Sequence, residues 1–254
     1  MEKAMFRLDG KTALVTGAAT GIGAGIAMML ARQGATVVIS DRPGESLAAT
    51  AESIKRHNGS VMELEMDVCD AGQVRTGIRK IQEAFGKVDI LVNNAAVNRP
   101  APGLEVTEES WDDHFEANVK GGFFLAQKVA PMMIQQKWGR VIWISSQSGL
   151  IGIPGQPVYC STKGAVIQLV KVLGLEWAKH GITVNSVAPT FVETNMTRKR
   201  LQNQEFLRFV LGKIPIGRLA TIDEVAAAVA FLASEEASMI NCHALRVDGG
   251  WTAW

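Results

Sequence analysis

Short, almost continuously apolar runs recur along the chain and alternate with longer stretches in which apolar and polar residues are interleaved. Apolar runs bounded by glycine and polar residues are typical of strands covered on both faces of a sheet. We therefore predict strands at Thr12–Thr16, Thr36–Ser40, Val61–Met66, Asp89–Asn93, Arg140–Ser145, Ile182–Val187 and Ala244–Val247.

The stretches between these runs show helical periodicity. The spacing of four apolar residues predicts one face of a helix: Ile22, Ile26, Met29 and Leu30. Gly34 should end that helix. Thr221 and Glu224 form a capping-box pattern that begins another helix, which reaches Ala233. Alternating strands and helices predict an α/β fold with a doubly wound parallel sheet of about seven strands.

The whole chain, residues 1–254, is predicted to form a single domain, because no linker, repeat or low-complexity stretch interrupts the pattern. The segment at about 190–217 has no strand pattern and is predicted to be a mobile lid. Its basic residues are predicted to lie on a solvated helix face and not to bind an acidic substrate. They are Arg198, Lys199, Arg200, Arg208 and Lys213.

Composition excludes several classes of protein. The net charge is +1 with dispersed Lys and Arg, so neither nucleic acid nor a membrane surface is an expected partner. No apolar run reaches the roughly 18 residues that span a bilayer, and the first residues do not resemble a signal peptide. The three cysteines lack metal-ligand spacing and indicate reduced thiols, which favours a cytoplasmic location. The four histidines are scattered and are expected to be satisfied or exposed rather than metal ligands.

A glycine-rich turn, Gly17–Gly23, lies directly between the first predicted strand and a helix. Glycines let the backbone approach a pyrophosphate closely, and the helix N-terminus supplies free N–H groups. An ordinary structural turn is the alternative, but the flanking strand and helix favour a Rossmann dinucleotide-binding domain. The predicted binding residues here are Gly17, Thr20, Gly21, Ile22 and Gly23.

Two aspartates end the next two predicted strands. Asp41 can accept hydrogen bonds from both ribose hydroxyls and would repel a 2′-phosphate, so NAD is predicted over NADP. Arg42 follows it and leaves NADP possible. Asp67 is either a ligand of the adenine amino group or a strand-end cap.

Tyr159 is the only tyrosine of the chain and stands four residues before Lys163. On a helix these two side chains project from the same face. The ammonium would lower the pKa of the phenol toward working pH, which suits a general acid/base. By itself the pair is also compatible with a surface tyrosine beside a solvated lysine.

Together, the glycine turn and the Tyr159/Lys163 pair resemble the short-chain dehydrogenase/reductase family. The resemblance extends along nearly the whole chain through Asn93–Ala96, Asn118, Ser145–Ser146, Pro189, Thr194 and Val247–Gly250. The chain departs from the family pattern at Ala96 and Thr190, where glycine is usual, and at Asn241-Cys242, where threonine and glycine are common. The first two departures add bulk near the expected nicotinamide.

The resemblance implies a hydride transfer in which Tyr159 exchanges the hydroxyl proton. It implies that Lys163 holds the nicotinamide ribose and favours phenolate, that Ser146 hydrogen-bonds the developing oxyanion, and that Asn118 holds a relay water. It further implies cofactor contacts at Val68, Asn94, Ala95, Tyr159, Lys163, Pro189, Val192 and Thr194.

The substrate site implied by the resemblance carries amide and guanidinium side chains, which suit hydroxyls or a carboxylate better than a steroid or long acyl chain. The expected substrate residues are Asn98, Arg99, Ser146, Gln147, Gln156 and Tyr159. Both ends of the chain resemble bacterial polyol and sugar-acid dehydrogenases of this family, of the galactitol dehydrogenase and gluconate 5-dehydrogenase type. The alternatives are an NADPH-dependent 3-oxoacyl-thioester reductase, against which Asp41 counts, and a non-catalytic nucleotide-binding regulator.

A homotetramer is the expected assembly. Relatives use the helix with Tyr159 and its predecessor, and this helix has an apolar stripe longer than one core face needs: Val166, Leu169, Val170 and Leu173. Trp251 and Trp254 would be unfavourable on an exposed terminus, which suggests burial against another subunit. No metal site is predicted, apart from Mg²⁺ at the carboxylate of Trp254, which the resemblance leaves possible.

Overall fold

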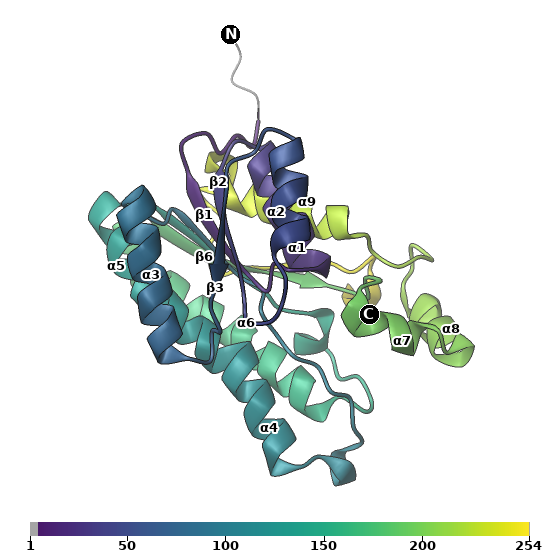
Figure 1. Ribbon diagram of the computed structural model, residues 1–254. Coiled ribbons are helices and arrows are strands. Elements are labelled where there is room, and N and C mark those ends of the chain that lie inside the picture. Colours follow the sequence, from purple (N-terminus) through teal and green to yellow (C-terminus); the bar gives the residue numbers. More distant parts are fainter. Residues whose placement is uncertain (1–4, 254) are drawn as a thin grey trace.

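Seven parallel strands form one sheet in the order β3-β2-β1-β4-β5-β6-β7 (Figure 1). The computed structural model describes residues 5–253. The strands are β1 (Thr12–Thr16), β2 (Thr36–Asp41), β3 (Val61–Glu65), β4 (Ile90–Asn93), β5 (Gly139–Ile144), β6 (Ile182–Pro189) and β7 (Ala244–Val247). The predicted α/β fold is therefore confirmed, and no strand end differs from the predicted one by more than two residues.

Helices cover both faces of the sheet (Figure 1). The core on one face involves α1 (Gly21–Arg32), α2 (Ala48–Arg56) and α9 (Ile222–Ala233). The core on the other face involves α3 (Ala71–Phe85), α5 (Gly122–Gln136) and α6 (Pro157–Trp177). The central strands lie between these two cores, which is why they are apolar along their whole length.

Two predicted helix ends are present, and one further cap was not predicted. Thr221 and Glu224 form the reciprocal capping box of α9. Gly34, at φ +100°, follows the end of α1 and adopts a conformation that residues with a Cβ rarely take. Asp70 caps α3 by accepting from the N–H groups of Gly72 and Gln73.

Strand order reverses between β1 and β4, and in an open parallel sheet ligands bind at such a point beyond the carboxyl ends of the strands. The helix that follows β4 includes α4 (Glu108–Phe115) and a π-helical segment, η2 (Glu116–Gly121), before α5. After β6 the chain forms α7 (Asn195–Leu201) and α8 (Gln204–Lys213), which lie apart from the two main helix layers (Figure 1).

Trp251 is buried within its own chain, so the inference that it needs another subunit is wrong. Its ring stacks on Phe191 at 5.8 Å between centroids and packs with Val210 and Ile214. The α8 segment after β6 therefore covers the indole. Trp254 lies outside the described residues.

The apolar stripe on α6 also belongs to the chain's own core. Val166, Val170 and Leu173 are buried in the core against β5 and β6, and Leu169 packs on the same cluster. The outward-facing apolar side chains of this helix are instead Val172 and Leu175. By length and apolar composition Pro157–His180 could cross a membrane, but its packing against β6 identifies it as the core helix of this fold.

Asn241 and Cys242 lie between β6 and α6 and contact both elements. The Asn241 side chain accepts from Val184 N at 2.8 Å and donates to Gly174 O at 2.9 Å. Cys242 adopts φ +60°, and a Cβ on Gly174 would lie only 2.5 Å from its Sγ. The unusual pair thus fills the space that Gly174 leaves open.

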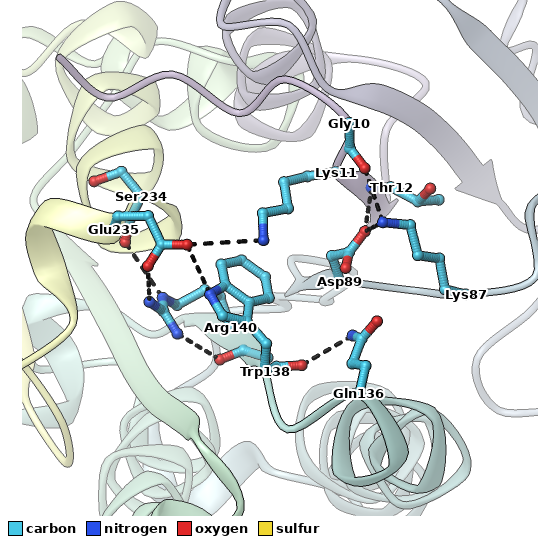
Figure 2. Close-up of polar contacts among 11 residues, drawn as sticks. Gly10, Lys11, Thr12, Lys87, Asp89, Gln136, Trp138, Arg140, Ser234 and Glu235 are labelled. Carbon is cyan, nitrogen blue, oxygen red and sulfur yellow. Dashed lines mark hydrogen bonds and ion pairs between the residues drawn. The ribbon is translucent and has the colours of Figure 1, made fainter. Parts of the chain in front are cut away.

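At the amino ends of the strands, charged groups surround Trp138 (Figure 2). Lys11 Nζ lies 3.3 Å from the centroid of the indole and Arg140 Cζ lies 4.4 Å from it. Glu235 accepts from Trp138 Nε1 at 2.9 Å and pairs with Arg140 at 3.4 Å. This cluster joins β1, β5 and the end of α9, at the opposite end of the sheet from the switch point.

Candidate active site

The glycine turn crosses the first residues after β4 at close range. A Cβ on Gly17 would lie 2.9 Å from both Ala95 Cα and Asn94 Nδ2, and Gly17 itself has φ +64°. Thr20 precedes α1 but makes no side-chain capping bond to it. The first N–H groups of α1 are therefore left for a ligand phosphate.

Thr16 and Asn94 brace this turn, and sequence reasoning missed the role of Thr16. Thr16 Oγ1 accepts from the N–H groups of Asn94 and Ala95, both at 3.1 Å. Asn94 Nδ2 donates to Thr16 O at 2.9 Å and Gly17 O at 3.0 Å. A polar residue at the end of an otherwise apolar strand was the available signal.

Asp41 ends β2 beside the same turn. Its carboxylate accepts from Ala19 N and from Arg42 N, each at 3.0 Å, which holds it at the groove. Arg42 pairs with Glu45 at 2.9 Å. Asp67 accepts from Cys69 N at 2.8 Å, so it has a local capping role, and its adenine contact stays a prediction.

A groove of about 670 Å³ runs along the carboxyl ends of the strands past most of the predicted cofactor residues. It is lined by Gly17, Thr20, Gly21, Ile22, Gly23, Asp41, Asp67, Val68, Asn94, Ala95 and Thr194. A glycine cradle, uncapped N–H groups and a carboxylate at the end of β2 fit a dinucleotide. The remaining predicted cofactor residues line the adjoining cavity: Tyr159, Lys163, Pro189 and Val192.

That adjoining cavity, of about 110 Å³, holds three of the four predicted catalytic residues: Ser146, Tyr159 and Lys163. Ser146 follows β5, and the other two lie on the first turns of α6. The Ser146 hydroxyl lies close enough to the Tyr159 phenol to lower its pKa. The predicted helical pairing of Tyr159 with Lys163 is thus realised at the point where the nicotinamide end of the groove would lie.

Burial dominates the electrostatics of this pair. It raises the pKa of the Tyr159 phenol to about 12, against a smaller lowering by the Ser146 hydroxyl. It also lowers the pKa of Lys163 to about 8. Lys163 Nζ donates to Ile144 O at 2.8 Å and lies 5.5 Å from the centroid of the phenol ring. In the protein alone, burial therefore outweighs any lowering of the phenol pKa by Lys163, and the effect of Lys163 beside a bound nicotinamide stays a prediction.

Asn118, the fourth predicted catalytic residue, lies in η2 and does not line this cavity. Its Oδ1 accepts from Val97 N at 2.7 Å, and its Nδ2 donates to Thr162 Oγ1 at 3.1 Å. A buried void of about 10 Å³, close to the space of a single water, is lined by both Asn118 and Lys163. Two buried polar atoms on its wall lack a partner, Trp143 Nε1 and Asn93 Oδ1. Such a site fits a bound water.

The predicted substrate residues separate into two groups. Asn98, Gln147 and Gln156 line the cavity with Tyr159. Arg99 does not: its guanidinium is paired with Asp113 and lies along the larger groove. Its assignment to the substrate cavity is corrected, because a nearby carboxylate draws the side chain away.

No cluster of three or more His, Cys, Asp or Glu side chains that could hold a metal ion occurs in residues 5–253. The predicted Mg²⁺ contact at Trp254 falls outside the described residues.

Comparisons with known proteins agree with this geometry. A family model described as enoyl-(acyl carrier protein) reductase matches residues 17–252. A 3-oxoacyl-(acyl-carrier-protein) reductase of Thermotoga maritima is 38% identical over 96% of this chain and 98% of its own. D-threitol dehydrogenase of Mycolicibacterium smegmatis is 39% identical over 97% of this chain and 95% of its own.

A solved structure is similar throughout. Gluconate 5-dehydrogenase of Burkholderia cenocepacia, in complex with NADP and tartrate, superimposes with a TM-score of 0.94 at 37% identity and covers 98% of both chains. The chain belongs to the short-chain dehydrogenase/reductase family. It is an NAD(P)-dependent oxidoreductase acting on CH–OH groups.

Proposed function

We propose that this enzyme transfers a hydride between NAD and a secondary alcohol or ketone of a polyol, sugar or sugar acid. The observation that carries the proposal is the set of buried polar atoms without partners in the cavity beside Tyr159. Both amide atoms of Gln147, Asn98 Oδ1 and Thr190 Oγ1 are of this kind. Unpartnered buried donors and acceptors favour a ligand with several hydroxyls or a carboxylate.

In this proposal Tyr159 takes the hydroxyl proton during oxidation and returns it during reduction. The bound dinucleotide supplies the hydride acceptor or donor. Ser146, which lines the same cavity as the phenol, holds the substrate oxygen as its charge changes. Lys163 holds the cofactor ribose and passes protons toward the void that it shares with Asn118.

Thr190 gives the site a feature that the family pattern lacks. It is buried at the end of β6, and its N–H is held by Val247 O at 3.0 Å. The hydroxyl oxygen lacks a partner and faces the cavity that also contains Gln147. A threonine here narrows the space and adds a polar contact, which favours a small hydroxylated substrate over a long acyl chain.

Asp41 supports a preference for NAD over NADP. Backbone donors orient its carboxylate beside the glycine turn, where a 2′-phosphate would meet negative charge. The nearby Arg42 is paired with Glu45, which reduces its availability to a phosphate. The Burkholderia cenocepacia relative was solved with NADP, so this preference is a property proposed for the present chain.

The segment around α7 and α8 is proposed to act as a lid. Thr194 lines both the groove and the cavity, and Met196 does the same. Residues that line both spaces and stand apart from the sheet can close over the dinucleotide and substrate together.

A 3-oxoacyl-thioester reductase is the second candidate, favoured by the 38% identical Thermotoga maritima relative. The two functions are separated by incubating the enzyme with NAD⁺ and a panel of polyols, aldonates and simple secondary alcohols. NADH formation with one stereochemically related group supports the proposal. A silent panel combined with NADPH consumption on an acetoacetyl thioester would replace it with the second candidate.

A homotetramer is proposed as the working assembly, with α5 and α6 at an interface. Phe124 on α5 is 45% exposed, and Val172 and Leu175 on α6 are 44% and 74% exposed. Light scattering after gel filtration should give four times the chain mass of 27.3 kDa. Leu175→Glu should lower the mass, because a charge would be buried at the interface. A monomer in the wild type would contradict this assembly.

A further inference from the structure

The loop after β4 is held by two side chains from the helix that follows it. Asn118 makes two bonds to Val97, accepting from its N–H at 2.7 Å and donating to its carbonyl oxygen at 3.0 Å. Four residues earlier, His114 Nε2 accepts from Arg99 N at 3.0 Å. The backbone is therefore fixed on both sides of Asn98.

His114 is fully buried, and both of its ring nitrogens are used within the chain. Nδ1 donates to Ser110 O at 2.5 Å, while Nε2 accepts from the Arg99 amide. A backbone N–H can only donate, so the imidazole is neutral with its proton on Nδ1. This confirms His114 as a satisfied histidine and gives it a specific partner on the loop.

Asn98 points from this loop into the cavity beside Tyr159. Its Nδ2 donates to Gln156 Oε1 at 3.2 Å, and its Oδ1 is buried without a partner. The carboxamide therefore keeps hydrogen-bonding capacity that is directed at a ligand. His114 itself lines neither the cavity nor the groove.

We propose that His114 is a positioning residue that sets Asn98 to hydrogen-bond a substrate oxygen other than the one on the reacting carbon. The inference deepens the proposed function and rests on it. His114 acts through the Arg99 amide, so its loss should weaken the binding of substrates with such a second oxygen. Substrates without one should be turned over as before.

The test compares variants that differ in the acceptor at position 114. His114→Leu is apolar and offers no acceptor to Arg99 N, whereas His114→Gln retains a carbonyl oxygen. With D-threitol or D-gluconate, whichever the wild type oxidises, His114→Leu should raise KM about tenfold, the size of one lost hydrogen bond. Its kcat and KM for 2-butanol should stay within about twofold of wild type, and His114→Gln should restore most of the affinity.

A double variant shows whether His114 works through Asn98. Asn98→Ala should raise KM by itself, and adding His114→Leu should cause little further rise, because both changes remove the same contact. Full additivity would overturn the proposal, as would an equal KM rise for 2-butanol. An unchanged KM in a folded His114→Leu enzyme would overturn it as well. If His114→Leu does not fold, His114→Met makes the same comparison with a more adaptable side chain.

Failure of the proposed function is seen separately, in the wild type alone. If the wild type oxidises neither polyol nor aldonate but reduces an acetoacetyl thioester, the proposed function is wrong. The same variants are then compared on that thioester and on 2-butanone, which lacks the second oxygen. A KM rise confined to the thioester still supports His114 as a positioning residue, and equal effects on both refute it.

Discussion

Tyr159 carries the proposed chemistry, and its surroundings in the protein alone favour the neutral phenol. Burial raises the pKa of Tyr159 to about 12, and burial also lowers the pKa of Lys163 to about 8. The two shifts have one cause, since a low-dielectric cavity disfavours both charged forms. A catalytic phenolate therefore requires a further positive charge close to the ring, which an oxidised nicotinamide in the groove would supply.

Binding of NAD⁺ should lower the pKa of Tyr159, whereas NADH, with its neutral nicotinamide, should lower it less. Because Tyr159 is the only tyrosine, labelling tyrosine Cζ with ¹³C gives a single resonance whose shift reports ionisation. The phenolate fraction grows as pH rises through this pKa, so oxidation should accelerate with pH and reduction should slow. An equal pKa with both cofactors would show that the nicotinamide charge does not act on the phenol.

The residues that the sequence predicted well are those with a fixed spacing along one element. Tyr159 and Lys163 are four apart on α6, so their meeting in the cavity follows from helix geometry alone. The partners of Thr16 and His114 lie in other elements, and no local pattern could show them. Arg99 was misplaced because its carboxylate partner, Asp113, comes from α4.

At the scale of elements, one threonine ties α7 to the segment that follows β6. Thr197 Oγ1 donates to Val192 O at 2.5 Å and accepts from Thr194 N at 3.0 Å. It closes the capping box of α7. Thr194 and Val192 are both predicted cofactor contacts, so the capping of α7 and the shape of the nicotinamide end of the site depend on the same hydroxyl.

Thr197→Val should weaken NAD binding by about fivefold, corresponding to a helix cap worth about 1 kcal/mol. The shape of the side chain is kept, so the change reports the hydroxyl. Thr197→Ser retains the hydroxyl and should bind nearly as wild type. Titration of intrinsic fluorescence with NADH measures both, and amide exchange across 195–213 should accelerate only in the valine variant. Equal affinities for the two variants would contradict this role.

The elements themselves were predictable where the pattern was strong. Apolar runs located the interior strands because these are covered on both faces, as Val141 in β5 and Val184 in β6 show. The edge strands β3 and β7 are only partly buried. The π-helical segment around Asn118 was not predicted, since its extra residue leaves no signal in hydrophobic spacing. The stripe on α6 was assigned to an interface because periodicity shows that a face is apolar and not what covers it.

For the whole molecule, the two ends of the sheet have separate tasks. The carboxyl ends of the strands carry the groove and the cavity, while the amino ends carry the cluster around Trp138 (Figure 2). Arg140 is almost fully buried there, and Glu235 is the carboxylate that pairs with it. Neutralising Glu235 should therefore lower the stability of the fold and leave the site at the carboxyl ends of the strands unchanged.

Glu235→Gln should lower the free energy of unfolding by about 1–2 kcal/mol, below the value for a fully buried pair because Glu235 is half-exposed. Denaturant unfolding measures the loss, and kcat and KM should remain within about twofold. Glu83→Gln is the control, since Glu83 and its partner Arg79 are both exposed, and its effect should stay below about 0.5 kcal/mol. Equal losses in both variants would show that the cluster adds no stability.

The most direct test of the account is the rate of NADH formation by Tyr159→Phe on the best substrate of the wild type. The substitution removes one hydroxyl and preserves the ring. If Tyr159 is the general acid/base, kcat should fall by at least about 10²–10⁴-fold while NADH still binds. Activity within tenfold of wild type would contradict the account, because the proton would then have to leave by a route that does not involve this phenol.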